Sequence, residues 1–248
     1  MIEPLAELRA MAYPGRVVIL GQNSGADRSV VVYAITGRSP SSQARELRFK
    51  GNAIWTIPTD EEALKKGNAD LLVYMAIAFG RGIAVSNGRQ TEDILNQIQG
   101  NDDPQEVLRH GLNNWTYEPD SPHYTPRISG CILPNGRASL SLLRRGKDGF
   151  AQRPFFTWNL RPGKGKLIAT YSGSEENPLP SFQGGPVDID IEEGTAAGMA
   201  EAVYAALRPG YPEKDYRVAV AAVYAESSNV QKFQVSIINK KERQEEHG

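Results

Sequence analysis

Cysteine and histidine are scarce in this chain, which has one cysteine and three histidines among 248 residues. The lone cysteine, Cys131, cannot form an intramolecular disulfide or a cysteine-based zinc site. Because such usage fits a reducing compartment, we expect a cytoplasmic protein. Cys131 lies in an apolar run with no histidine nearby in sequence, which favours a buried structural role over a nucleophile. His110, His123 and His247 show no metal-ligand spacing, so no metal site is expected.

Long apolar runs and an excess of charge are also lacking. The best run, Leu71 to Phe79, is far shorter than the roughly 18 apolar residues that a membrane span requires. The first residues mix acidic with apolar side chains and lack the basic start of a signal peptide. The formal net charge of -1 gives no general positive field for nucleic acid or an anionic membrane. We therefore expect neither as a partner.

The common catalytic signatures are missing too. The chain contains no G-x-S-x-G nucleophile turn, no G-x-G-x-x-G dinucleotide loop and no Walker A loop. These absences exclude the usual serine-hydrolase, dinucleotide and nucleoside-triphosphate sites. No metal or organic cofactor is implied.

The composition is that of an ordinary globular protein. Hydrophobic residues make up 40% of the chain and charged residues 23%, which is compatible with a large core. No stretch has the composition of a linker, so we expect a single domain over residues 1–248. Its last residues, about 239–248, are expected to form a charged tail.

Apolar runs and turn signals predict a chain dominated by antiparallel hairpins, with helices in two clusters. Strands are expected at residues 16–20, 29–35, 46–57, 128–133, 138–143, 155–160, 166–171, 187–191, 216–224 and 232–238, and a hairpin at 71–86. Helices are expected at residues 5–11, 91–99, 103–115 and 195–208, with a helical turn at 60–66. Residues 172–186 contain three prolines and three glycines and are expected to form a long surface loop, able to act as a lid. This pattern predicts an antiparallel α+β protein with helices covering the sheet faces.

Residues 36–45, TGRSPSSQAR, follow an expected strand and place two guanidiniums, Arg38 and Arg45, around a glycine, a proline and several hydroxyls. An arginine fork matches phosphate or carboxylate oxygens, and a tight turn can point backbone N–H groups at the same anion. A solvated surface turn with an arginine at each end is an equally good interpretation of this segment alone.

Residues 117–130, YEPDSPHYTPRISG, concentrate Glu118, Asp120, tyrosines and Arg127 in a loop stiffened by prolines. A stiff loop carrying an acid, a phenol and a guanidinium is what a preorganised site requires. The alternative is an irregular connection in which Arg127 pairs with an acid at the surface. Two further residues have structural alternatives as well, since Asn87 can simply form a turn and Tyr74 can simply be a core tyrosine.

Four segments, taken in order, resemble the archaeal-type inosine monophosphate (IMP) cyclohydrolase family. They are YPGRVVILG at residues 13–21, YAITGRSPSSQAR at 33–45, AVSNGRQTEDI at 84–94 and YEPDSPHYTPRISG at 117–130. The resemblance implies an enzyme that closes 5-formamidoimidazole-4-carboxamide ribotide to IMP with loss of water, the last step of de novo purine synthesis. It also implies a four-layer α-β-β-α sandwich of antiparallel sheets, like that of N-terminal-nucleophile hydrolases but without their chemistry.

The same resemblance implies roles for individual residues. Glu118 is expected to transfer protons, Tyr74 to polarise the formyl oxygen and Arg45 to hold the reacting carboxamide or formyl oxygen. The residues expected to bind substrate are Arg38 and Ser39, for polar or phosphate oxygens, and Asn87 and Arg127 as second-rank contacts.

Two other functions remain open at this stage. One is a non-catalytic protein that binds a purine nucleotide, and the other is an enzyme of the same fold acting on a different ribotide. In each case the partner is a small-molecule ribotide, and a homo-oligomer is left open.

Overall fold

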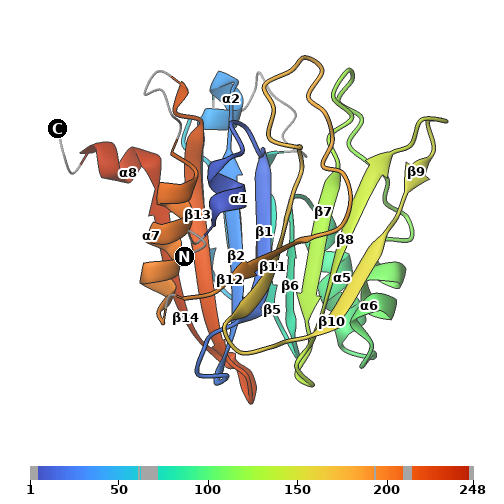
Figure 1. Ribbon diagram of the computed structural model, residues 1–248, viewed down its shortest axis with the longest axis vertical. Helices are drawn as coiled ribbons and strands as arrows, with labels where there is room; N and C mark the ends of the chain where they lie inside the picture. Colours follow the sequence, from blue (N-terminus) through green and yellow to red (C-terminus); the bar gives the residue numbers. More distant parts are fainter. Residues whose placement is uncertain (1–4, 61, 63–71, 193, 209–213, 246–248) are drawn as a thin grey trace.

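Two antiparallel sheets packed face to face form the body of the protein (Figure 1). The computed structural model describes residues 5–60, 62, 72–192, 194–208 and 214–245. The six-stranded sheet has the order β12 (Val187–Asp190), β11 (Lys164–Ala169), β1 (Arg16–Gln22), β2 (Arg28–Thr36), β13 (Arg217–Glu226) and β14 (Asn229–Asn239). The eight-stranded sheet has the order β10 (Phe155–Asn159), β8 (Arg137–Arg145), β7 (Arg127–Ile132), β6 (Ile83–Ser86), β5 (Tyr74–Phe79), β4 (Ala53–Pro58) and β3 (Arg45–Lys50), with β9 (Ala151–Gln152) paired to β8.

Helices cover the outer face of each sheet. On the six-stranded sheet, α7 (Ala196–Ala206) packs against β13 and β14, and the short α1 (Ala6–Arg9) contacts α7. On the eight-stranded sheet, α5 (Gln90–Ile98) and α6 (Pro104–Gly111) lie side by side over β5 to β8 and β10. The predicted antiparallel α+β class is therefore confirmed.

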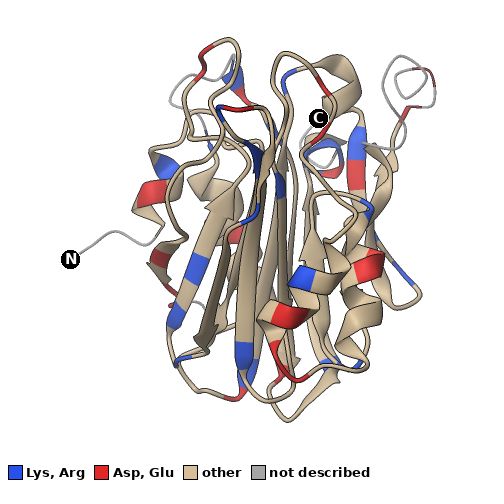
Figure 2. Cartoon of the chain, turned by 90° about the vertical axis from the view of Figure 1, so that its right-hand side faces the viewer, with Lys and Arg blue, Asp and Glu red and all other residues tan. Residues whose placement is uncertain are grey.

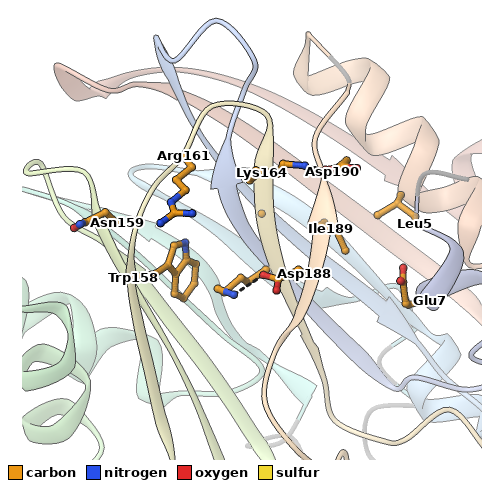
Figure 3. Close-up of a pocket in the computed structure, with 11 residues that line it drawn as sticks. Leu5, Glu7, Trp158, Asn159, Arg161, Lys164, Asp188, Ile189 and Asp190 are labelled. Atoms are coloured by element: carbon orange, nitrogen blue, oxygen red, sulfur yellow. Dashed lines mark hydrogen bonds and ion pairs between the residues drawn. The ribbon is translucent and has the colours of Figure 1, made fainter. Parts of the chain in front are cut away.

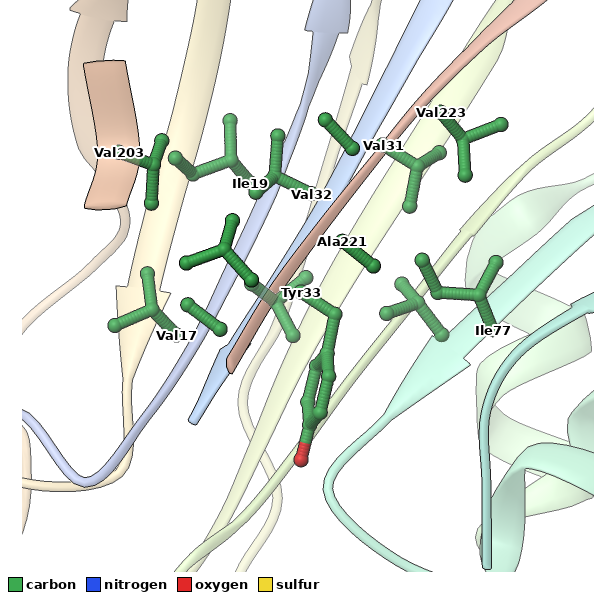
Figure 4. Packing of buried hydrophobic residues seen from close by; sticks show 14 of the residues in the cluster. Val17, Ile19, Val31, Val32, Tyr33, Ile77, Val203, Ala221 and Val223 are labelled. Atoms are coloured by element: carbon green, nitrogen blue, oxygen red, sulfur yellow. The ribbon is translucent and has the colours of Figure 1, made fainter. Parts of the chain in front are cut away.

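Side-chain alternation along the strands builds two apolar layers, one on each face of the six-stranded sheet. Figure 4 shows Val203 of α7 near Val17 and Ile19 on the outer face, while Val31 and Ile77 lie on the other side of the sheet, in the same apolar cluster. Burying such side chains contributes roughly 1.5–3 kcal/mol each relative to exposure. The interior between the sheets is therefore apolar over most of its length, and the exceptions stand out.

Several predicted elements differ from those in the structure. Residues 46–57 do not form one strand, because Gly51, with a φ of 63°, makes the turn of a hairpin between β3 and β4. A Gly-Asn pair is a hairpin signal, and the prediction of a single strand over residues 46–57 overlooked it. The helix α5 begins at Gln90, one residue before the expected start at Thr91, and the hydroxyl of Thr91 lies 2.6 Å from that of Ser86. The helical turn at 60–66 lies mostly outside the described residues.

The predicted hairpin of residues 71–86 is confirmed for its described part, and the loop at 172–186 contains no named helix or strand. Cys131 is fully buried, as expected for a structural cysteine, and burial raises the pKa of its thiol. No helix among the described residues is long and apolar enough to cross a membrane.

The predicted charged tail is folded over its described part. Asn239, only 4% exposed, ends β14, and its side chain accepts the N–H of Leu47 at 2.9 Å and donates to the Leu47 carbonyl at 3.2 Å. The helix α8 (Lys240–Glu245) follows, and Arg243 pairs with Glu201 on α7. The end of β14 and the helix α8 are thereby held against the edge strand β3 of the other sheet.

We expect Asn239→Ala to lower the free energy of unfolding by about 1–3 kcal/mol, because it leaves the buried N–H and carbonyl of Leu47 without partners. Urea denaturation measures the change. The exposed Asn159, replaced by alanine, is the control and should stay within about 0.5 kcal/mol of wild type. Equal stability of the two variants would contradict a structural role for the bonds between Asn239 and Leu47.

Candidate functional site

The predicted site residues converge because of the antiparallel topology. In neighbouring antiparallel strands, the end of one strand lies beside the start of the next. Arg16 starts β1, Tyr33 lies near the end of β2, Arg45 starts β3 and Tyr74 starts β5. Arg127 starts β7, directly after the loop that carries Glu118. These residues therefore gather at one end of the sandwich.

Two tyrosines and two arginines form the polar part of the interior. The hydroxyls of Tyr33 and Tyr74, both fully or almost fully buried, lie 2.6 Å apart. Each hydroxyl has one hydrogen, so one of the two remains free to donate to a third group. Burial raises the pKa of Tyr33 well above its ordinary value, which keeps its phenol protonated at neutral pH.

Arg45 is 2% exposed and carries donors that the protein does not satisfy. Its Nε donates to the carbonyl of Ser42 at 3.1 Å, but its Nη1 and Nη2 are buried without a hydrogen-bond partner, as is the Nε of Arg16. Burial and the nearby charge of Arg16 lower the pKa of Arg45 to about 10, so it stays charged at neutral pH. A buried donor without an acceptor costs about 1–3 kcal/mol, more when charged, so these atoms indicate a place for an oxygen-rich ligand.

Glu118 is the carboxylate of this cluster. It is 6% exposed, and its Oε1 lies 3.8 Å from Nη1 of Arg127 and 3.4 Å from Nδ2 of Asn87. Burial raises the pKa of Glu118 to about 7, although the positive charges of Arg127, Arg16 and Arg45 oppose the shift. Both the acid and its conjugate base are therefore populated near neutral pH, which suits a group that accepts and returns a proton.

Asn87 and Arg127 hold the loop that carries Glu118. The amide of Asn87 donates to the carbonyl of Pro126 at 2.9 Å and accepts the N–H of Ile128 at 2.9 Å. Arg127 donates to the carbonyl of Thr116 at 2.9 Å, and its guanidinium lies 4.8 Å from the ring centre of Trp115. Both residues are thus bonded to the protein, and their contacts with the loop hold the carboxylate in place.

The rest of the loop is braced from within and by a tyrosine. Asp120 accepts the N–H of Thr125 at 2.7 Å and also its hydroxyl, and that hydroxyl lies 2.5 Å from the hydroxyl of Tyr171. Tyr171 stacks on Tyr13 with ring centres 5.7 Å apart. His123 accepts the N–H of Leu179 through Nδ1 at 3.1 Å, so this loop is bound to residues 172–186.

Arg38 and Ser39 lie at the surface, outside the buried cluster. Ser39 caps the short helix α2 (Pro40–Gln43) by accepting the N–H of Ser42 at 3.2 Å. The guanidinium of Arg38 lies over the ring of Tyr13, 4.9 Å from its centre, so the tyrosine stands between it and the interior. The substrate-binding role predicted for these two residues stays a prediction.

A larger groove of about 700 Å³ lies away from this cluster (Figure 3). It runs along β11 and β12 beside Trp158, at the end of the sheet where β1 finishes rather than where it starts. Its lining carries three basic and three acidic side chains, and four of the six are paired within the protein, since Lys164 lies 2.5 Å from Asp190 and Lys166 forms an ion pair with Asp188. Figure 2 shows the same mixing of acidic and basic residues over the face that it displays.

Two members of the cluster were not among the predicted site residues. Arg16 and Tyr33 both belong to the segments that carry the family resemblance, and an arginine at the start of an apolar strand was an available signal. Their inward orientation depends on strand register, which the sequence does not state. Among the described residues, no group of three His, Cys, Asp or Glu side chains lies close enough to hold a metal ion.

Comparison with known proteins gives one family for most of the chain. Residues 13–229 match the family described as "IMP cyclohydrolase-like protein". The chain is 26% identical over 194 residues to the IMP cyclohydrolase of Halobacterium salinarum, covering 78% of this chain and 85% of that protein. It is 25% identical over 193 residues to the IMP cyclohydrolase of Methanothrix thermoacetophila, covering 77% and 85%. The cluster described above lies wholly within the matched range.

The raised pKa of Glu118 predicts a pH-dependent stability. The carboxyl has a pKa of about 7 in the folded protein against 4.5 as its ordinary value. The contribution of the Glu118 carboxyl to the stability of the folded protein is therefore fully present below pH 4.5, and it is lost as the pH rises through 7. Between about pH 4 and pH 8, we expect wild type to lose about 3 kcal/mol of unfolding free energy that Glu118→Gln does not lose.

Urea denaturation at the two pH values measures this difference. Glu92→Gln, which changes an exposed carboxylate on α5, is the matched control and should follow wild type. Parallel pH profiles for wild type and Glu118→Gln would mean that the carboxyl is not perturbed.

Proposed function

Because the chain belongs to the IMP cyclohydrolase-like family, we propose that it closes 5-formamidoimidazole-4-carboxamide ribotide to IMP with loss of water. The observation that carries the proposal is the buried carboxyl of Glu118, with a pKa near 7, in the same interior cluster as guanidinium nitrogens without protein partners. The names of the archaeal relatives support the same activity.

The reaction needs positioning and proton transfer more than any other chemistry. A bond forms between the carboxamide nitrogen and the formyl carbon, and the formyl oxygen leaves as water. One hydrogen of that water comes from the carboxamide nitrogen and the other from the formamido nitrogen. Holding the two reacting groups of one molecule together can contribute several kcal/mol, on the order of the effective-concentration gains of intramolecular reactions.

In this proposal, three residues transfer the protons and bind the reacting oxygens. Glu118 accepts a proton from nitrogen as a carboxylate and delivers one to the departing oxygen as an acid. The free hydrogen of the Tyr33–Tyr74 pair is donated by Tyr74 to the formyl oxygen. The unpartnered nitrogens of Arg45 hold the carboxamide or formyl oxygen, where negative charge develops.

Asn87 and Arg127 support the proposal indirectly, by fixing the carboxylate. Arg38 and Ser39 remain candidates for binding outer parts of the ribotide. The proposal does not depend on three other predictions, which are the likeness to N-terminal-nucleophile hydrolases, the cytoplasmic location and the oligomeric state.

We expect Glu118→Gln and Arg45→Ala each to lower kcat by about a hundredfold or more, with the fold retained. Glutamine has the shape of glutamate but cannot transfer the proton. Alanine lacks the guanidinium, and with it the unpartnered Nη1 and Nη2 of Arg45. Formation of IMP from the formamido ribotide, followed by ultraviolet absorbance, gives the rates. Glu92→Gln and Arg161→Ala, both at exposed positions, are the controls and should keep wild-type turnover.

Binding of IMP measured alongside separates the competing functions. Binding without conversion in the wild-type protein would favour a purine nucleotide-binding protein. Neither binding nor conversion would favour another ribotide as substrate. Near-normal turnover in both Glu118→Gln and Arg45→Ala would refute the roles given to these residues.

A further inference from the structure

Tyr171 lies between the two segments that carry charged groups of the cluster. It follows β11, and its backbone N–H donates to the carbonyl of Pro14 at 3.1 Å, in the segment that leads into Arg16. Its hydroxyl lies 2.5 Å from that of Thr125, in the loop that carries Glu118. Because Tyr171 is only 5% exposed, both contacts are made inside the protein.

We propose that Tyr171 is a positioning residue for Glu118. Through Thr125 it holds the loop of the carboxyl in place beside the segment of Arg16, and it acts on that loop rather than on the substrate. The inference rests on the proposed function only for its consequence in turnover. Its structural part concerns the surroundings of Glu118 and is tested without a substrate.

The direction of the hydrogen bonds follows from the chemistry of the groups. The carboxylate of Asp120 can only accept, and it takes both the N–H of Thr125, at 2.7 Å, and the hydroxyl hydrogen of Thr125. The hydroxyl oxygen of Thr125 is then left to accept, so the hydrogen between the two hydroxyls belongs to Tyr171. Burial raises the pKa of Tyr171, which keeps its phenol protonated and able to donate.

The ring of Tyr171 is held independently of its hydroxyl. It stacks on Tyr13 with ring centres 5.7 Å apart and an angle of 22° between the planes. A second contact is with the backbone of Gly15, where φ is 75° and a Cβ atom would lie 2.6 Å from the ring. Only glycine leaves room for the ring at this position. Removing the hydroxyl of Tyr171 alone therefore leaves the packing of its ring in place.

Thr125 connects Tyr171 with the backbone of Glu118. The N–H of Glu118 donates to the carbonyl of Thr125 at 2.9 Å, which closes the loop. A hydrogen bond to the side chain of Thr125 therefore limits the movement of both ends of the loop. Residues 172–186 add a second connection, because the N–H of Leu179 donates to Nδ1 of His123 at 3.1 Å.

The charges that face Glu118 come from several elements. Arg127 of β7, Arg16 of β1 and Arg45 of β3 are cations, and Asp120 of the same loop is an acid. Burial outweighs the cations and raises the pKa of Glu118 to about 7. The carboxyl keeps this pKa only while the loop excludes water from it.

The test is Tyr171→Phe, which deletes the hydroxyl and keeps the ring. We expect water to reach the carboxyl in the loosened loop, so the titration midpoint of Glu118 should move about one pH unit lower. Carbon-13 NMR of protein labelled at its glutamate carboxyls measures the midpoint without a substrate, and the signal missing in Glu118→Gln identifies the residue. A midpoint that is unchanged or higher would overturn the proposal.

Turnover gives a second measurement. In Tyr171→Phe, kcat for the formamido ribotide at pH 7 should fall by about fivefold to tenfold, with KM within about twofold of wild type, because the ligand itself is not touched. The acidic limb of the profile of kcat against pH should move to lower pH, as the midpoint does. A rise in KM with kcat unchanged would assign Tyr171 to ligand binding and refute the positioning role.

Variants at Thr125 test whether the effect passes through its hydroxyl. Thr125→Ser keeps the hydroxyl and should retain the wild-type midpoint and kcat. Thr125→Val lacks it and should show an effect at least as large as that of Tyr171→Phe. Adding Tyr171→Phe to Thr125→Val should then change little further, because the bond is already gone. Additive effects of the two substitutions would contradict a shared bond.

Tyr216→Phe is the matched control. Tyr216 packs edge-on against Tyr13 with ring centres 5.3 Å apart, and its hydroxyl donates to Glu175 at 3.0 Å. The variant thus removes a tyrosine hydrogen bond from the same aromatic cluster without removing a bond to the loop of Glu118. It should leave the midpoint, kcat and KM unchanged. Equal shifts in Tyr216→Phe and Tyr171→Phe would reduce the effect to a general loosening of the cluster and end the proposal.

The two measurements separate this inference from the cyclohydrolase assignment. If the ribotide is not converted but the midpoint of Glu118 depends on Tyr171, the positioning role stands and the assignment falls. If IMP forms at the wild-type rate in Tyr171→Phe and the midpoint is unchanged, the assignment stands and the positioning role falls.

Discussion

The burial of Glu118 among cations, at one end of an otherwise apolar sandwich, is the constraint on which the rest of the site depends. A buried carboxylate raises the free energy of the folded state unless positive charges and hydrogen-bond donors surround it. Burying the surrounding guanidiniums also costs free energy unless an anion or an oxygen-rich ligand is near them. The raised pKa of Glu118 reflects this balance, since burial outweighs the attraction of Arg127 and Arg16. The same balance keeps the carboxyl able to change protonation state near neutral pH.

The two sheets contribute different parts of this arrangement. The six-stranded sheet provides Arg16 and Tyr33 from adjacent strands, whereas the eight-stranded sheet provides Arg45 and Tyr74. The hydrogen bond between the two tyrosine hydroxyls joins the sheets at the level of the cluster. Polar contact therefore replaces apolar packing at this end, and the apolar core below it keeps the two sheets at a fixed separation.

Residues 239–245 complete the architecture around Arg45. Asn239 bonds to both backbone groups of Leu47, two residues beyond Arg45 on the edge strand. This contact spans the two sheets and fixes the start of α8. A segment whose composition indicates a solvated tail thus lines a small cavity together with Arg45.

The sequence by itself determined a great deal about this protein. Composition and sequence context argued against a membrane span and a cysteine nucleophile, and hairpin signals predicted most strands to within a few residues. Four ordered segments identified the family and pointed to Arg45, Tyr74 and Glu118. These features are local, because turn residues, apolar alternation and short motifs act over a few positions.

Only the tertiary structure decided which residues share one interior. Arg16 and Tyr33 join the cluster because strand register turns them inward, and Asn87 and Arg127 support the carboxylate because the loop folds back on them. Arg38 lies outside the cluster, over the ring of Tyr13, although it belongs to the same motif as Arg45. The hairpin at Gly51 was missed although its Gly-Asn turn is a local signal. The contacts of residues 239–245 with Leu47 and Glu201, in contrast, join distant parts of the chain. Contacts between residues far apart in the chain are set by packing and charge burial, which no local pattern encodes.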